Sequence, residues 1–266
     1  MKPNVSPCEG HRTTARVLDI IELVSQHKEG LSFSSIAKEI GMPKSSLHPL
    51  LHTLSDRNYL FYDSALQRYY LGEMCFRLGS MFMNSVDILK AIQREIEILA
   101  HETSEIVYMG VRHGSEVLYL AKAEADIAIR IVTAGVGHQL PAYCTGLGKA
   151  LLLDLSLEEL KALYPNGMAA LTQNTITSVG ALHEQLVRMK QQGYSEEKEE
   201  STIGIQCIGV PVRVDGKIIA ALSSSVPIFR FNKELETQLR SKLPEVALKI
   251  AAHITANKDA WNRLCP

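Results

Sequence analysis

The side chains near the N-terminus best suited to chemistry lie in one short stretch, KSSLHPLLHTL. Its hydroxyl, imidazole and ammonium groups can all hydrogen-bond, and no acidic residue occurs between positions 42 and 55. Such groups can reach base edges in a DNA groove or meet phosphate, where a carboxylate would be repelled. The stretch therefore favours contact with DNA. Its polar members are Lys44, Ser45, Ser46, His48 and His52.

The two histidines also have the i, i+4 spacing of zinc ligands on a helix. A zinc-protease helix needs a glutamate directly after the first histidine, and Pro49 follows His48 here. The five cysteines of the chain are scattered and never form a C-x-x-C pair. We expect no metal site, no disulfide framework and no cofactor.

Apolar periodicity predicts three short helices that carry this stretch. Segments 17–24, 33–40 and 47–54 place apolar residues at i, i+3, i+4 and i+7. None is long enough to be stable alone, so their apolar faces must pack together. Ser32 suits the N-cap of the second helix.

The second and third helices are separated by three residues, Gly41-Met42-Pro43, which is the layout of a helix-turn-helix. With Ser45 as the N-cap of the third helix, Pro49 falls just past its first turn, where a proline costs little.

A predicted hairpin over residues 59–72 follows and could serve as a wing. The alternative is a helical hairpin with a solvated polar face, as occurs in any α-rich protein. On the first interpretation, four arginines could add DNA-backbone contacts around the third helix. They are Arg12, Arg16, Arg57 and Arg68.

After residue 72, helices and strands alternate without a βαβ pattern. Helices are predicted at 73–85, 86–104, 145–154, 157–163, 179–192 and 232–257, and strands at 105–113, 116–123, 128–132, 203–214 and 217–226. Asp215-Gly216 is a strong hairpin turn between the last two strands. Mixed elements joined by hairpins indicate an α+β fold with an antiparallel sheet.

This second part contains fragments of enzyme motifs, and each fragment fails at a specific residue. A P-loop around GK at 148–149 fails at Tyr143 and Ala150, and a dinucleotide fingerprint fails at Leu140. The serines at 223–225 lack the glycines of a nucleophile elbow. We therefore expect a protein that is not an enzyme.

The residues of this second part fit a ligand-binding site better than an enzyme active site. CTGLGKALL places small residues and free N–H groups at a helix start, although a tight helix entry explains it equally well. SEEKEE, residues 195–200, is by default a solvated acidic loop. Ser223 and Ser225 alternate along a strand and so face one side, which suits either a pocket wall or a surface.

The net charge of −1 argues neither for nucleic acid nor for a membrane surface. No apolar run approaches the roughly 20 residues of a membrane helix. The N-terminal residues lack the apolar core of a signal peptide, so a cytoplasmic location is expected.

Several ordered motifs resemble IclR-type bacterial transcriptional regulators. They include RVLDIIELV, LSFSSIAKEIGMPKSSLHPLLHTL, LPAYCTGLGKALL, LTQNTIT, GYSEEKEESTIGIQCIGVPV and AALSSSVPIFRF. The resemblance implies a winged helix-turn-helix at 10–72, a linker helix at 73–86 and a GAF-like effector-binding domain at 87–266.

The resemblance also implies an effector pocket, formed by a helix-start loop, an acidic residue, a cysteine and strand serines. Carried over position by position, these residues are Ile129, Leu140, Gly146, Leu147, Glu197, Cys207, Ser223 and Ser225.

Three departures from the family pattern are evident. Pro49 stands where the family carries arginine, Glu197 where aspartate is commoner, and Ser225-Val226-Pro227 where glycine often precedes proline. The longer carboxylate could hydrogen-bond the hydroxyls of a sugar, and the SxPxxRF ending resembles that of sugar-acid-responsive members of the family. The resemblance therefore implies a sugar acid or keto acid as effector.

We therefore expect a transcriptional regulator, with repression and activation both open. It should bind double-stranded DNA at a palindromic operator as a homodimer or homotetramer. The competing class is a metabolic enzyme that uses the C-terminal pocket, with the N-terminal helices only structural.

Overall fold

The computed structural model describes residues 11–84, 87–125 and 134–265. The chain divides into two compact units, with the boundary between Ser85 and Val86. The predicted 128–132 strand and Ile129 lie outside the described residues. In the described parts, no helix is both long and apolar enough to cross a membrane, and no cluster of metal-ligating side chains occurs.

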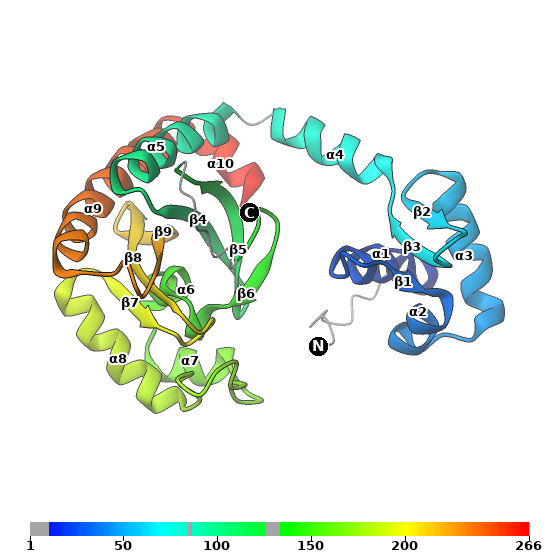
Figure 1. Ribbon diagram of the computed structural model, residues 1–266, viewed down its shortest axis with the longest axis horizontal. Helices are drawn as coiled ribbons and strands as arrows, with labels where there is room; N and C mark the ends of the chain where they lie inside the picture. The colour runs from blue at the N-terminus through cyan, green and yellow to red at the C-terminus, as the bar shows by residue number, and fades with distance from the viewer. Residues whose placement is uncertain (1–10, 85–86, 126–133, 266) are drawn as a thin grey trace. The chain divides into compact units, whose positions relative to one another are not determined.

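The first unit is a three-helix bundle with a small sheet (Figure 1). The apolar stripes of the three helices pack together as expected, around Ile20, Ile36, Leu47 and Leu51. The strands pair in the order β1-β3-β2. The elements are α1 (Arg12–Ser25), β1 (Leu31–Ser32), α2 (Phe33–Ile40), α3 (Lys44–Asp56), β2 (Leu60–Asp63), β3 (Arg68–Leu71) and α4 (Glu73–Asn84).

The turn between α2 and α3 forms as the sequence predicts. The Ser32 hydroxyl caps α2 by accepting from the Ser35 N–H at 3.1 Å. Gly41 ends α2 with a φ of +67°, a conformation that glycine adopts without strain. Leu47 is fully buried where the two helices meet.

The predicted start of α3 is wrong. The helix begins at Lys44 with Pro43 as its N-cap, because the Pro43 carbonyl already accepts from the N–H groups of Ser46 and Leu47. Pro49 therefore lies inside the helix, beyond its first turn. Since proline has no N–H, the usual helical bond to the Ser45 carbonyl is absent.

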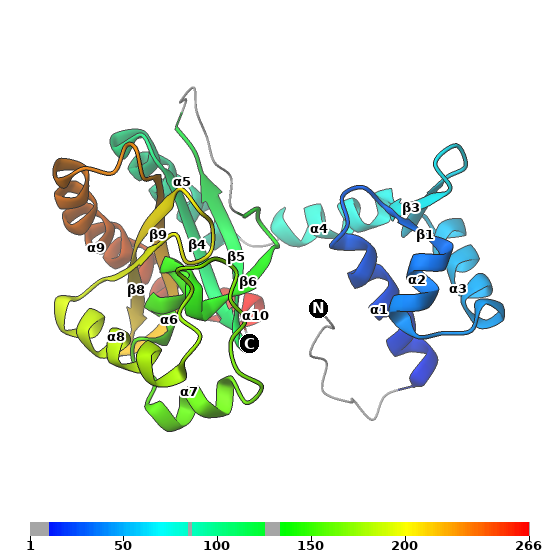
Figure 2. The same cartoon turned by 60° about the horizontal axis from the view of Figure 1, so that its bottom comes forward.

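The second unit is a six-stranded antiparallel sheet in the order β6-β5-β4-β9-β8-β7, covered by helices on both faces (Figure 2). Helices α5 and α9 pack on one face, around Ile92, Leu222 and Ile250. Helix α6 packs on the other face, whose core also includes residues of α7 and α8. This arrangement confirms the α+β class.

Most elements of this unit lie close to their predicted bounds. The helices are α5 (Asp87–Thr103), α6 (Gly146–Leu152), α7 (Leu157–Leu163), α8 (Val179–Gln192), α9 (Lys233–Ala256) and α10 (Lys258–Leu264), with a 3-10 turn η1 (Ala142–Cys144). The strands are β4 (Ile106–His113), β5 (Glu116–Ala123), β6 (Gln139–Pro141), β7 (Ser195–Lys198), β8 (Ile205–Val214) and β9 (Lys217–Pro227).

The interpretation of residues 195–200 as a solvated loop is wrong. Ser195–Lys198 form the edge strand β7, which pairs with β8. Ser195, Glu197 and Glu200 are buried. The cause is tertiary: helix α6 covers this edge of the sheet and supplies partners for the polar groups, as described below.

Candidate nucleic-acid interface and ligand pocket

Helix α3 has a buried apolar face and an exposed polar face. Leu47, Leu51 and Leu54 are buried against the bundle. The side chains singled out for DNA contact all lie on the outside of the helix, as the sequence analysis expects. The exposed residues are Lys44, Ser45, Ser46, His48 and His52.

One exposed carboxylate lies at the end of this polar face. The His52 ring Nδ1 is 2.7 Å from the Asp56 Oδ2, and both side chains are more than 60% exposed, at 67% and 63%. Asp56 stands directly after the acid-free interval of residues 42–55. The His52 ring can donate a hydrogen bond either to Asp56 or to DNA. The Asp56 carboxylate repels a phosphate that comes close to it.

The four candidate arginines differ in their surroundings. Arg12 and Arg57 are exposed, and Arg16 is half-buried. The Arg68 guanidinium donates from Nη1 to the carbonyls of Glu29 and Gly30, both at 3.0 Å. Arg68 therefore ties the hairpin to the turn that precedes β1, a structural role that the sequence analysis did not predict.

The second unit contains a narrow pocket between α6 and the sheet. In this conformation the cavity has room for little more than one water molecule, so an organic ligand enters only if the surrounding side chains move. Six of the expected effector residues line it, and four further residues were missed. The expected six are Leu140, Gly146, Leu147, Cys207, Ser223 and Ser225, and the four others are Tyr108, Tyr119, Thr145 and Ser201.

The pocket lies where the first turn of α6 touches β8. A Cβ atom on Gly146 would meet the Cys207 Cβ at 2.7 Å, so only glycine allows this approach. The Ser195 hydroxyl donates to the Gly146 carbonyl at 2.6 Å, and Thr145 caps α6 by accepting from the Gly148 N–H at 3.0 Å. These contacts hold the helix start against the strands.

Ser223 and Ser225 of β9 point to the face of the sheet that carries the pocket. Ser223 is paired with Tyr108 and Ser225 with Cys207, on the pocket face. Both are buried, which rules out a surface position. The Ser225 Oγ makes no hydrogen bond of ordinary geometry among the described residues and interacts with the neighbouring Cys207 thiol.

Glu197, which was also expected in the pocket, is not one of its lining residues; it lies opposite the lining residue Cys207 and is almost fully buried. Its Oε2 accepts from the Glu200 N–H at 2.9 Å, whereas its Oε1 has no hydrogen-bond partner in the described parts of the chain. Burial raises the pKa of Glu197 to about 7, against the opposing effect of neighbouring hydrogen bonds and Lys149. Near neutral pH, this carboxyl can therefore accept or donate a hydrogen bond.

A buried ion pair joins α6 to the residue that holds the Glu197 carboxyl. The Lys149 ammonium, which is fully buried within α6, donates to the Glu200 carboxylate. The other Glu200 oxygen lacks a partner among the described residues. The signal available in the sequence was a lysine directly before the apolar run ALLL, since a buried lysine needs an anion.

The arginine of the SxPxxRF ending is a structural anchor in this structure. Arg230 donates from Nε and Nη2 to the two oxygens of the buried Glu105, at 2.7 and 2.6 Å. It does not line the pocket. The pair fixes the corner between β9 and α9 to the start of β4.

Two family models match most of the chain. The model of the IclR helix-turn-helix domain matches residues 13–64, and that of the bacterial transcriptional regulator IclR C-terminal domain matches residues 81–252.

Among curated relatives, the HTH-type transcriptional regulator BhcR of Paracoccus denitrificans is 30% identical, over 96% of this chain and 91% of its own. The HTH-type transcriptional regulator XynR of Escherichia coli is also 30% identical, over 90% of this chain and 96% of its own. Both are named as regulators rather than enzymes.

Solved structures agree in fold. An IclR transcriptional regulator from Alicyclobacillus acidocaldarius superposes with a TM-score of 0.82 at 24% identity, covering 92% of this chain and 99% of its own. An IclR homologue from Microbacterium hydrocarbonoxydans, solved with 4-hydroxybenzoate, gives 0.74 at 22% identity, covering 91% of this chain and 99% of its own.

Proposed function

The chain belongs to the IclR family of bacterial transcriptional regulators, and we propose that it binds its operator through α3 under the control of a small organic acid. The proposal of operator binding rests on the exposed polar face of α3, which lies within the matched helix-turn-helix domain. The second helix of this motif is the one that enters the major groove. The enzyme alternative is not supported, because the relatives are named regulators.

We propose a homodimer or homotetramer that reads a palindromic operator. Helix α4 supports self-association, because it exposes several large apolar side chains that a monomer in water would leave uncovered. They are Phe76, Leu78 and Met81. A two-fold assembly would place two copies of α3 on two half-sites.

The effector class proposed is a sugar acid or keto acid. The pocket supports it with hydroxyl groups at several positions, and the Oε1 of Glu197, next to the lining residue Cys207, suits a ligand hydroxyl. The 4-hydroxybenzoate in the Microbacterium homologue is also an organic acid. The ligand changes DNA affinity only if it favours one conformational state over another.

A gel shift with the DNA upstream of the protein's own gene tests both parts. We expect a discrete complex whose affinity falls as salt is raised, because phosphate contacts release counterions. A panel of sugar acids and keto acids should then contain a compound that alters the complex. If no complex forms at low salt, or if unrelated DNA binds equally well, the operator proposal is wrong.

A further inference from the structure

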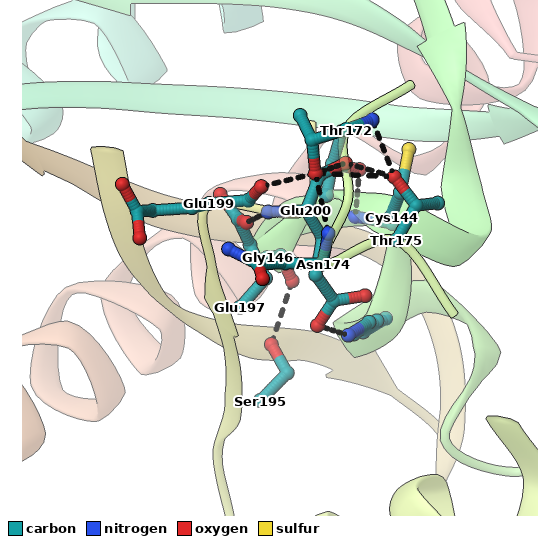
Figure 3. Close-up of polar contacts among 12 residues, drawn as sticks. Cys144, Gly146, Thr172, Asn174, Thr175, Ser195, Glu197, Glu199 and Glu200 are labelled. Atoms are coloured by element: carbon teal, nitrogen blue, oxygen red, sulfur yellow. Dashed lines mark hydrogen bonds and ion pairs between the residues drawn. The ribbon is translucent and has the colours of Figure 1, made fainter. Parts of the chain in front are cut away.

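Two threonines in the LTQNTIT segment hold the backbone beside the pocket. The Thr172 hydroxyl donates to the Glu199 carbonyl and the Thr175 hydroxyl to the Glu200 carbonyl, each at 2.6 Å (Figure 3). The Thr175 oxygen also accepts from two backbone N–H groups, those of Leu171 and Thr172, at 3.0 and 2.9 Å. Both threonines therefore link the α7–α8 connection to the turn after β7.

The turn that they hold has an unfavourable backbone conformation. Glu199 has a φ of +55°, a region that residues other than glycine rarely adopt. Its side chain accepts from the Gly204 N–H at 2.9 Å, and its own N–H donates to the Ile205 carbonyl at 2.7 Å. Such a conformation persists only where neighbouring contacts enforce it.

The same turn positions the polar groups of the pocket. The Glu200 N–H fixes the Glu197 carboxyl, the Glu200 carboxylate meets the buried Lys149, and Ser201 lines the pocket. Neither threonine lines the pocket itself. Any influence of Thr172 and Thr175 on a ligand must therefore act through residues 197–201.

We propose that Thr172 and Thr175 are positioning residues of the effector pocket. Their hydroxyls hold the turn at residues 199–201 in the conformation that places Ser201 in the pocket wall and fixes the Glu197 carboxyl beside it. They set effector affinity without touching the effector. The inference rests on the proposed effector function, and the experiment below separates the two.

The first readout needs no ligand. Cys207 lines the pocket, so its alkylation by iodoacetamide in the full-length protein, followed peptide by peptide, reports access to the site. The double variant Thr172→Val/Thr175→Val keeps the side-chain shape and removes both hydroxyls. We expect Cys207 to react faster, by on the order of tenfold, because the turn opens more often.

The matched variant Thr172→Ser/Thr175→Ser keeps the hydroxyls and should react at nearly the wild-type rate. Cys265, which packs against the α5–α9 face, is the internal control and should be unaffected. The proposal is overturned if Cys207 reacts no faster in the valine variant, if Cys265 accelerates equally, or if the serine variant behaves like the valine variant.

The second readout is a thermal-shift titration with pyruvate and D-gluconate as probes. A probe that stabilises the wild type should bind the valine variant on the order of tenfold more weakly, and the serine variant almost normally. Equal affinity in all three would also overturn the positioning role. If neither probe stabilises the wild type, the proposed effector class is wrong for these compounds, and Cys207 alkylation alone decides the role of the threonines.

Discussion

Glu197 and Cys207 lie directly opposite each other on the neighbouring strands β7 and β8. Burial raises the pKa of both groups, to about 7 for the carboxyl and well above the ordinary value for the thiol. The thiol is thus protonated at neutral pH, and the carboxyl is close to half-protonated. Of these two groups beside the pocket, only the Glu197 carboxyl can change from acceptor to donor within the physiological pH range.

The raised pKa of Glu197 makes the stability of the protein depend on pH. The folded state holds this proton up to about pH 7, whereas the unfolded carboxyl loses it near its ordinary value of 4.5. Between these values the folded state binds more protons, so stability falls as pH rises, by at most about 3–4 kcal/mol. In Glu197→Gln this loss should be absent.

Urea unfolding of the two proteins from acid to neutral pH measures this difference. Glu196→Gln, which alters the neighbouring carboxyl on the same strand, is the matched control and should follow the wild type. Indistinguishable pH profiles for the wild type and Glu197→Gln would mean that this carboxyl titrates normally.

The buried Lys149–Glu200 pair should be costly to break from one side. Lys149→Met leaves the Glu200 carboxylate buried without its cation, and a loss of about 3–5 kcal/mol is expected. The double variant Lys149→Met/Glu200→Gln should recover part of this loss. Chemical denaturation provides the measurement.

The exposed ion pair of Lys190 with Asp154 offers a comparison for that experiment. The Lys190 side chain is 55% exposed, so Lys190→Met should cost at most about 1 kcal/mol. If Lys149→Met cost no more than Lys190→Met, the buried pair would not contribute as described.

Substitutions of Arg68 and Arg57 should distinguish an arginine that stabilises the fold from one that contacts DNA. Arg68→Met removes the hydrogen bonds to Glu29 and Gly30 and should lower the stability of the first unit by about 1 kcal/mol. Arg57→Met, at an exposed position, should leave stability unchanged and weaken DNA binding only. Thermal unfolding and DNA titration of both variants check this; equal stabilities would remove the structural role of Arg68.

The elements that sequence reasoning predicted well are those with strong local signals. Helices α7 and α8 have the predicted bounds, because the Ser156–Glu159 capping box starts one and Gly193, at a φ of +82°, ends the other. The hairpin of β8 and β9 turns at Asp215-Gly216, both at positive φ. Such signals lie within a few residues of the element they define.

The elements that were missed depend on distant residues. Strand β7 is polar in sequence and becomes buried only because α6 packs over it and Lys149 faces Glu200. The very short β1 and β6 exist through pairing with β3 and β5. The pocket tyrosines, Tyr108 and Tyr119, look like ordinary strand residues until the sheet brings them together.

The central claim is that the exposed face of α3 reads DNA, and an anisotropy titration of the double variant Ser45→Ala/His48→Ala against the upstream DNA tests it most directly. Ser25→Ala, at an exposed position on α1, is the control. We predict that the double variant binds on the order of tenfold more weakly or worse, while its melting temperature and the affinity of the control stay at the wild-type values. An operator affinity equal to that of the wild type would contradict the account.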